Sequence, residues 1–140
     1  MNVFVDTSAF YAVLDRDDLN HSAARAAWAA LLREKATLFT TSYVLVETTA
    51  LLQHRIGIAA VRAFHEDILP LLQVDWIAEE GHRAGVEAVL AAGKKALSMV
   101  DCVSFQAMRQ MGLRHAFCFD RHFSEQGFAT KLSSFGSSAD

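Results

Sequence analysis

Apolar and polar positions fall into blocks along the chain, and the shortest apolar blocks predict β-strands. The first block covers residues 2–5, a run of β-branched and aromatic side chains that stops at Asp6. Three later blocks of the same kind cover residues 37–40, 73–77 and 116–119. The pattern therefore predicts four short strands, each followed by a polar segment.

Longer segments between these blocks repeat apolar residues every three or four positions, which is the period of a helix. They predict helices over residues 19–34, 43–55, 58–72, 79–92 and 101–111. A turn or the start of a further helix is expected directly after the first strand. The polar run from Gly93 to Lys95 interrupts the helical pattern and is expected to be a loop.

Residue types that begin or end helices mark several of these boundaries. Side chains of Asp, Ser and Thr accept hydrogen bonds from the first amides of a helix, and Gly adopts the conformation that ends one. The expected N-terminal caps are Asp17 with Asp18, and Thr41 or Ser42. The expected breaks are Gly57, Gly112 and Pro70, which allows at most a kinked last turn.

Strands that alternate with helices predict an α/β fold, in which a parallel sheet is flanked by helices on both faces. Residues 1–132 are expected to form a single domain, and residues 133–140, rich in Ser and Gly, a flexible tail. Ligand sites in such sheets lie beyond the carboxyl ends of the strands. Asp6 and Asp120 both stand at such an end.

Composition narrows the class of protein. The chain has 140 residues, 52% of them hydrophobic, and no apolar run approaches the roughly 18 residues of a membrane span. Without a secretory signal pattern at its start, the chain is expected in the cytoplasm, with Cys102 and Cys118 as reduced, buried thiols. The net charge of −3 gives no support to nonspecific attraction for nucleic acid, and the six histidines show no zinc-ligand spacing.

Four acidic residues are candidates for chemistry, and each also has a plain structural explanation. Asp6 is well placed to cap the next helix, and Asp101 fits a capping pattern with the serine three residues before it. Asp120 is explained by an Asx turn. Glu47 shares a helix face with apolar residues, which is unusual for an acid, unless it reaches solvent at the edge of that face or pairs with Arg55.

The four acids together predict a cation-binding site, which no single one of them would predict. In a parallel sheet, Asp6, Glu47, Asp101 and Asp120 would converge on the same edge. Carboxylates that close raise one another's pKa, so the cluster needs a compensating cation. Oxygen ligands suit Mg²⁺ or Mn²⁺ and not zinc. Two such ions can stabilise both the attacking and the leaving oxygen in phosphodiester hydrolysis.

The chain resembles PIN-domain nucleases over nearly its full length, and in particular the VapC-type toxins of bacterial toxin–antitoxin modules. The resemblance rests on four stretches in order: Val5 to Phe10, Val46 to Leu52, Leu97 to Phe105, and Phe119 to Phe123 with Gly127 and Phe128 after it. It implies that Asp6, Glu47, Asp101 and Asp120 bind one or two Mg²⁺ or Mn²⁺ ions. A metal-activated water would then cleave RNA.

The resemblance also implies supporting residues and partners. Thr7 or Ser8 is expected to position a carboxylate or a water through its hydroxyl group. The family commonly has Thr or Ser two residues before the fourth acid, whereas this chain has Cys118, which puts a hydroxyl contact there in doubt. The expected partners are an RNA substrate, a cognate antitoxin protein and, since the long apolar helices also favour it, a second copy of the chain.

Basic and imidazole side chains in loops beside the acids are candidates for phosphate contact, and the alternative for each is a solvated loop charge. They are Arg16, Lys94, Lys95, Arg121 and His122. A PIN-like module that binds RNA or protein and cuts poorly is the alternative function, with Cys118 as its main support. A haloacid-dehalogenase-type phosphatase would need Asp where Ser8 stands, and a receiver domain needs adjacent acids where the chain has Asp6 and Thr7.

Overall fold

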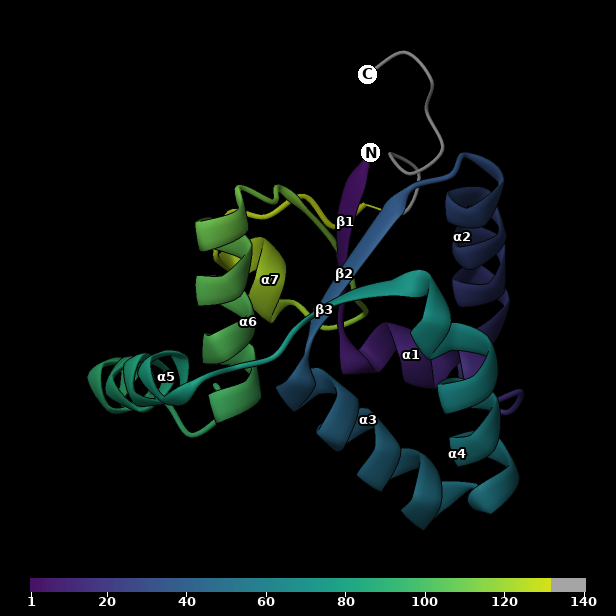
Figure 1. The fold of residues 1–140 in the computed structure, drawn as a ribbon, viewed down its shortest axis with the longest axis horizontal. Helices are drawn as coiled ribbons and strands as arrows, with labels where there is room; N and C mark the ends of the chain where they lie inside the picture. Colours follow the sequence, from purple (N-terminus) through teal and green to yellow (C-terminus); the bar gives the residue numbers. More distant parts are fainter. Residues whose placement is uncertain (132–140) are drawn as a thin grey trace.

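The sheet of this protein is parallel throughout, as the alternation of strands and helices predicts. The structure is a computed structural model that describes residues 1–131 (Figure 1). Its strands are β1 Asn2–Val5, β2 Thr37–Thr41, β3 Leu72–Asp75 and β4 His115–Phe117, hydrogen-bonded in the order β3-β2-β1-β4. The predicted tail, residues 133–140, lies outside the described residues.

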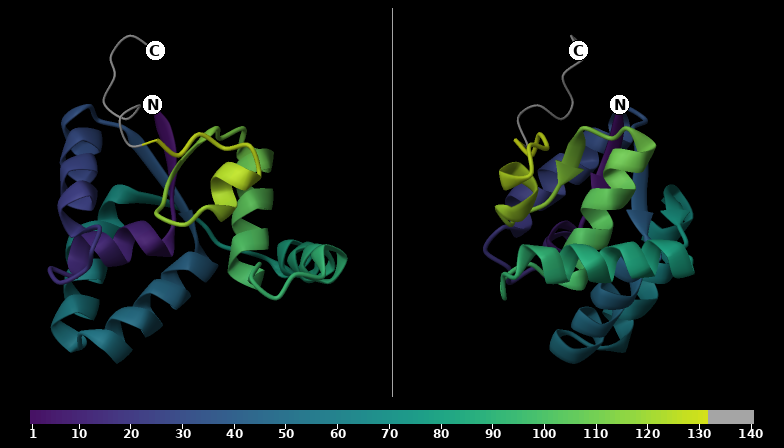
Figure 2. Two further views of the ribbon diagram at one scale, coloured as in Figure 1. Left: turned by 180° about the vertical axis from the view of Figure 1, so that it is seen from behind. Right: turned by 90° about the vertical axis from the view of Figure 1, so that its left-hand side faces the viewer.

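Helices cover both faces of the sheet, which confirms the predicted fold class. They are α1 Thr7–Leu14, α2 His21–Arg33, α3 Ser42–Arg55, α4 Ile58–Ala63, α5 Glu79–Ala92, α6 Met99–Met111 and α7 His122–Glu125, with the short turns η1 Phe64–Ile68 and η2 Leu69–Leu71. The helices α1, α2 and α4 lie on one side of the sheet, and α6 and α7 on the other (Figure 1). The helix α5 stands outside α6 (Figure 2).

The core explains why β1 is apolar at every position but its first. Val3, Phe4 and Val5 are fully buried, since a parallel strand covered on both faces has no solvent side. Aromatic rings continue the core on each face. Phe10 and Phe64 pack edge-to-face at 5.0 Å on one side, and the rings of Phe105 and Phe123 also lie 5.0 Å apart.

Helix caps agree with the sequence at most positions. Thr41 caps α3 by accepting a hydrogen bond from the amide of Val44, and α6 ends at Gly112 with a positive φ of 69°. The expected cap at Asp17 and Asp18 is wrong, because α2 begins at His21 after Asn20. Asp18 instead forms a turn, accepting a hydrogen bond from the Asn20 amide, and this turn delays the helix by two residues from the predicted start.

The segment 58–72 departs most from prediction. Instead of one kinked helix, α4 is followed by a π-helical turn at η1 and a 3₁₀ turn at η2, and residue Leu72 already belongs to β3. Pro70 has no amide hydrogen to continue an α-helix, which accounts for the break. The strand β3 ends at Asp75 and not at residue 77, because the Ile77 amide donates to Ser42 Oγ instead of to the sheet.

The other boundaries shift by a few residues. The helix α6 begins at Met99, two residues earlier than predicted, because its cap is Ser98. The strand β4 begins at His115 and ends at Phe117, two residues before the predicted end, and the short helix α7 was not predicted. Within the described part of the chain, no helix is long and apolar enough to cross a membrane.

The order of the strands creates a crevice at the carboxyl edge of the sheet. From β1 the chain crosses to β2 and β3 on one side, and then returns to β4 on the other side. The helices that follow β1 and β4 therefore leave in different directions, and such a point is where α/β sheets bind ligands. Asp6 directly follows β1, and Asp120 follows β4 by three residues.

Candidate active site

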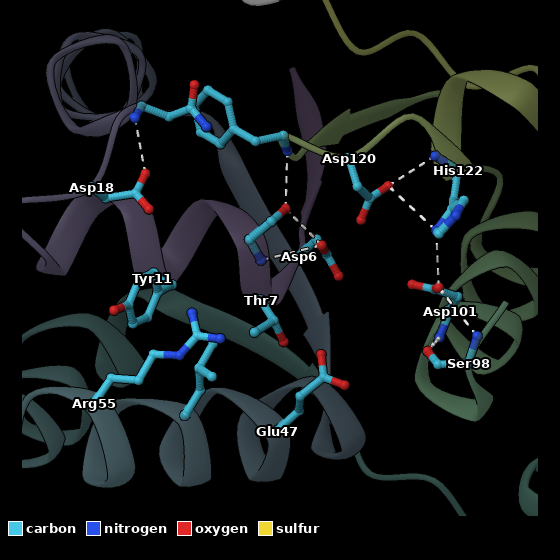
Figure 3. A pocket seen from close by; sticks show the side chains of 14 residues that line it. Asp6, Thr7, Tyr11, Asp18, Glu47, Arg55, Ser98, Asp101, Asp120 and His122 are labelled. Atoms are coloured by element: carbon cyan, nitrogen blue, oxygen red, sulfur yellow. Dashed lines mark hydrogen bonds and ion pairs between the residues drawn. The ribbon is translucent and has the colours of Figure 1, made fainter. Parts of the chain in front are cut away.

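A cavity of about 460 Å³ opens at this crevice. All four predicted acids line it, and Figure 3 shows their carboxylates around a common space. The remaining lining residues come from α1, the loop after it, α3, and the segments before α6 and after β4. They are Thr7, Ser8, Tyr11, Asp18, Asn20, Leu51, Arg55, Ser98, Phe119 and His122.

Asp6 is the most deeply buried of these acids, with 3% of its surface exposed. It caps α1 and its Oδ2 atom accepts two hydrogen bonds from Ser8, from the hydroxyl at 2.8 Å and from the amide at 3.2 Å. Burial raises the pKa of Asp6 to about 7, against the opposing effect of the Ser8 hydroxyl. The charges of Asp120 and Asp101 contribute to this rise, and a bound cation would oppose them and favour the ionised form.

Asp101 stands at the start of α6 in the predicted capping box. Its amide donates to Ser98 Oγ at 3.0 Å, and its Oδ2 accepts from the Ser98 amide at 3.3 Å. The same oxygen lies 3.2 Å from Nδ1 of His122. Burial raises the pKa of Asp101 and the charge of Asp120 adds to the effect, whereas Ser98 and His122 oppose it.

Asp120 lies in the turn between β4 and α7, where its Oδ1 accepts a hydrogen bond from the His122 amide at 2.9 Å. This is the Asx turn that the sequence suggested. The hydroxyl of Ser8 also accepts a hydrogen bond from the Phe119 amide at 2.9 Å. Ser8 therefore ties the segment that carries Asp120 to Asp6, and holds these two acids beside each other.

Glu47 approaches from α3, with its side chain directed toward the other acids (Figure 3). Burial raises its pKa, and the charges of Asp101 and Asp120 add to the rise, whereas the Thr7 hydroxyl lowers it. Thr7 is itself held by a hydrogen bond from the Thr48 hydroxyl at 3.1 Å. The suggested ion pair with Arg55 does not form, since no carboxylate among residues 1–131 lies within ion-pair distance of this arginine.

Three of the acids use one carboxylate oxygen for structure and leave the other without a hydrogen bond or ion pair to any described residue. The engaged atoms are Oδ2 of Asp6, Oδ2 of Asp101 and Oδ1 of Asp120. A ligand set of such oxygens, held in place through their partners, fits Mg²⁺ or Mn²⁺. The cavity therefore suits a hard divalent cation.

The structure brings some of these ligands closer together than others. Side-chain atoms of Asp101, Asp120 and His122 lie within 4.8 Å of one another, close enough to share one ion. Asp6 and Glu47 line the same cavity but do not belong to this compact group. The sequence placed His122 among the RNA contacts, whereas the structure places its ring between two acids.

Comparison with known proteins identifies the family. The family model described as PIN domain matches residues 3–129. The chain belongs to the PIN-domain family. The match confirms the resemblance on which the nuclease prediction rested.

One relative, matched by its sequence and by its crystal structure, carries the comparison further. The 23S rRNA-specific endonuclease VapC20 of Mycobacterium tuberculosis is 32% identical over 127 residues, which span 90% of this chain and 95% of that protein. Its crystal structure, titled as that of a sarcin–ricin loop cleaving toxin, superposes with a TM-score of 0.82 at 29% identity and covers 92% of this chain and 98% of the other. The predicted kinship with VapC-type toxins is confirmed.

A second solved structure shares the fold alone. FitAcB from Neisseria gonorrhoeae superposes with a TM-score of 0.66 at 15% identity, over 94% of this chain and 98% of that one. The family match replaces the phosphatase and receiver hypotheses. In the structure, Ser8 stands where a dehalogenase-type phosphatase would have a second acid, and its hydroxyl donates a hydrogen bond to the carboxylate of Asp6.

The loop residues predicted to contact RNA are spread over the PIN domain. His122 lines the acidic cavity, and Lys94 and Arg121 line a smaller adjoining hollow together with His122. Arg121 is largely exposed and pairs with Glu125 at 3.2 Å. Arg16 and Lys95 are exposed and line neither space.

Cys118 is buried near the acids but does not line their cavity. The residue is 5% exposed and its thiol faces the backbone carbonyls of Ala116 and Asp120, at 4.0 and 3.8 Å. Burial raises the pKa of this thiol. Cys118 does not line the acidic cavity. The presence of cysteine where the family commonly has Thr or Ser therefore removes no hydroxyl group from the cavity wall. Both cysteines are buried and free, as expected.

Sequence reasoning missed the residues at the end of the cavity opposite His122. Tyr11 and Arg55 lie there, on α1 and at the end of α3 (Figure 3). Arg55 was considered only as a partner for Glu47. The available signal was its position eight residues after Glu47, which places both near the same face of a helix.

Proposed function

We propose that this chain is a metal-dependent endoribonuclease and the toxin of a type II toxin–antitoxin pair. The observation that carries the proposal is the convergence of Asp6, Glu47, Asp101 and Asp120 on one cavity of a PIN domain. Three of them keep an unengaged carboxylate oxygen. The kinship with a VapC-type endonuclease supports hydrolysis of an RNA phosphodiester as the reaction.

In this proposal, the four carboxylates hold one or two Mg²⁺ or Mn²⁺ ions. When bound, such an ion supplies charge neutralisation for the phosphodiester and lowers the pKa of a coordinated water. Ser8 fixes the orientation of Asp6 and Ser98 fixes that of Asp101. Because these contacts fix the carboxylates in advance, the carboxylates need not reorganise when the substrate binds.

Other residues shape the cavity around the phosphodiester. His122 is hydrogen-bonded through its amide to Asp120 and lies against Asp101, so it sets the spacing of these two acids. Phe119 and Leu51 contribute apolar wall, which lowers the local dielectric and strengthens the electrostatic attraction of the acids for a cation. Lys94 and Arg121 would contact flanking phosphates from the adjoining hollow.

The kinship with VapC20 suggests a specific first substrate. That protein is named for 23S rRNA and for cleavage of the sarcin–ricin loop. We propose that this chain also cuts a structured RNA loop, and an RNA hairpin with the sarcin–ricin sequence is the first substrate to test. The proposed site of action is the cytoplasm, where ribosomal RNA is found.

The test is cleavage of this labelled hairpin by the purified chain with Mn²⁺, Mg²⁺ or EDTA, beside Asp6→Asn and Asp101→Asn. We expect cleavage only with the metals and a loss of at least about 100-fold in each variant, since removal of groups that merely support metal ligands already costs about 10- to 100-fold. Asp17→Asn, an exposed aspartate outside the cavity, is the matched control and should cleave normally.

Other outcomes contradict the proposal in different ways. Cleavage in EDTA, or undiminished cleavage by both variants, would exclude the acidic cavity as the active site. Metal binding without cleavage of the hairpin or of a structured RNA pool would favour the alternative, a PIN-like binding module. In that case Glu47→Ala should leave RNA binding and the cellular effect intact.

The proposed protein partners are a cognate antitoxin and a second copy of the chain. A neighbouring reading frame for a small DNA-binding protein that suppresses the toxicity of this chain would support the antitoxin. Without such a frame, a role in RNA processing would be favoured over a toxin role. Light scattering of the purified chain measures the predicted homodimer directly.

A further inference from the structure

The acidic cavity faces an electrostatic difficulty with its proposed substrate. Every phosphate of RNA is an anion, the chain carries a net charge of −3, and five of the residues that line the cavity are acids. Bound cations offset the repulsion only beside the ligating carboxylates. An RNA strand that crosses the cavity therefore needs cationic contacts for the phosphates on either side of the cleaved one.

Arg55 is the only Lys or Arg among the described residues that line this cavity. It occupies the end opposite His122 (Figure 3). On the His122 side, the adjoining hollow holds Lys94, together with Arg121 in its ion pair with Glu125. The acids thus lie between two sources of positive charge, one at each end of the cavity, which is the arrangement that a crossing polyanion requires.

The Arg55 side chain packs on Tyr11 and forms no ion pair with the described residues. Its guanidinium carbon lies 5.4 Å from the centre of the Tyr11 ring, over the face of the ring. Tyr11 is 9% exposed, and its hydroxyl donates a 2.6 Å hydrogen bond to Oδ2 of Asp15. Because no carboxylate of residues 1–131 lies within 4.0 Å of Arg55, its hydrogen-bond donors are not taken by an ion pair.

We propose that Arg55 binds a phosphate of the RNA strand next to the cleaved phosphodiester, with Tyr11 as the platform that orients its guanidinium. The inference rests on the proposed ribonuclease function. Arg55 follows Glu47 by eight residues, about 12 Å along α3. That separation sets Arg55 beyond the phosphate held at the acids, and its planar fork suits two oxygens of a neighbouring phosphate.

A purely structural role for Arg55 makes different predictions. The residue stands in the last turn of α3, where a positive charge stabilises the helix through its dipole. A lysine would keep this charge but lose the planar fork and the stacking on Tyr11. Substitution by glutamine removes the charge as well. The pair of variants therefore separates charge at the helix end from phosphate recognition.

The experiment measures kcat and KM for cleavage of the labelled sarcin–ricin hairpin in Mn²⁺ over a range of KCl, for wild type, Arg55→Gln and Arg55→Lys. We expect Arg55→Gln to raise KM about 10-fold with kcat nearly unchanged, as for removal of one charged hydrogen bond. The slope of log(1/KM) against log[KCl] should fall in magnitude by about 0.7, because the variant neutralises one phosphate fewer. Arg55→Lys should raise KM less and keep the wild-type slope.

Arg33→Gln is the matched control, because this exposed arginine also ends a helix, α2, but does not line the cavity. It should keep wild-type KM and slope. Wild-type kinetics for Arg55→Gln, or a loss confined to kcat or to thermal stability, would overturn the assignment and leave the ribonuclease function standing. Absence of metal-dependent cleavage by the wild type would overturn both.

Discussion

At the scale of single residues, the acids of this site serve backbone structure and the proposed chemistry at once. Asp6 caps α1, Asp101 completes the capping box of α6, and Asp120 closes the turn before α7. Each role engages one oxygen, so capping orients the carboxylate and leaves the other oxygen for a cation. The structural explanations that the sequence suggested for these three acids are therefore correct, and they do not compete with a functional role.

The raised pKa of Asp6 gives a prediction for the metal-free protein. Because burial raises this pKa from 3.8 to about 7, the stability that protonated Asp6 contributes is complete below about pH 4 and is lost as the pH rises through 7. Asp6→Asn has no such loss. In EDTA, we therefore expect the variant to gain melting temperature relative to wild type, more at about pH 8 than at about pH 5.

Thermal unfolding in EDTA at the two pH values measures this effect. We expect the stability difference between Asp6→Asn and wild type to grow by at least about 1 kcal/mol between the lower and the higher pH. For a chain of this size, this corresponds to about 3 °C in melting temperature. Asn can still accept the hydrogen bonds of Ser8, which preserves the cap of α1. The exposed Asp17→Asn variant should show no comparable change between the two pH values, and a constant difference for Asp6→Asn would contradict the argument.

At the scale of elements, the helix α6 carries Asp101 and is packed against α5 through a close contact at Gly85. This glycine is buried, and a Cβ atom there would lie 2.5 Å from Cγ2 of Val103 and 3.1 Å from Cε of Met99. Val103 is a core residue of α6 and is 2% exposed, so it has little room to move. Glycine is thus required by packing, although alanine is the better helix former.

Gly85→Ala is therefore expected to destabilise the protein by about 1–3 kcal/mol despite the gain in helix propensity. Urea unfolding measures the change. Gly81→Ala on the same helix is the control, because its Cβ would meet only the Cγ2 methyl group of the partly exposed residue Ile77, at 3.1 Å. A Gly85→Ala variant as stable as wild type would show that α5 and α6 can separate at no cost.

Sequence patterns predicted elements well where local signals agree. The helix over residues 79–92 has its predicted bounds, since a helical period ends there at Gly93 with a left-handed φ of 60°. The segment 58–72 was predicted as a single helix because its apolar spacing continues past Pro70. Three kinds of turn share this segment in the structure, and periodicity cannot distinguish them since their spacings are similar.

At the scale of the whole molecule, segments far apart along the chain meet at the carboxyl edge of the sheet. A cation at this edge would bind the folded state and not the unfolded chain, so it should stabilise the entire domain by mass action. At a concentration 100-fold above its Kd, the gain is about 2.7 kcal/mol. Melting temperature should therefore rise with Mn²⁺ at neutral or higher pH.

Asp101→Asn and Asp120→Asn should lose most of this stabilisation, because these acids and His122 form the compact group within 4.8 Å. Thermal shift across a Mn²⁺ titration is the measurement, with Asp17→Asn as the variant that should respond like wild type. Equal stabilisation of all variants would place the ion elsewhere. A smaller loss for Glu47→Gln than for Asp101→Asn would match the position of Glu47 outside the compact group.

The sequence by itself determined the strands, most helix caps, the parallel α/β class and the four acids that line one cavity. These features depend on neighbours within a few residues, or on the rule that parallel strands end at one edge. Only the tertiary structure decided that Ser8 would bind the amide of Phe119, 111 residues away, and that His122 would lie against Asp101. It also placed Arg55 on the ring of Tyr11, because the packing of α1 against α3 brings them together.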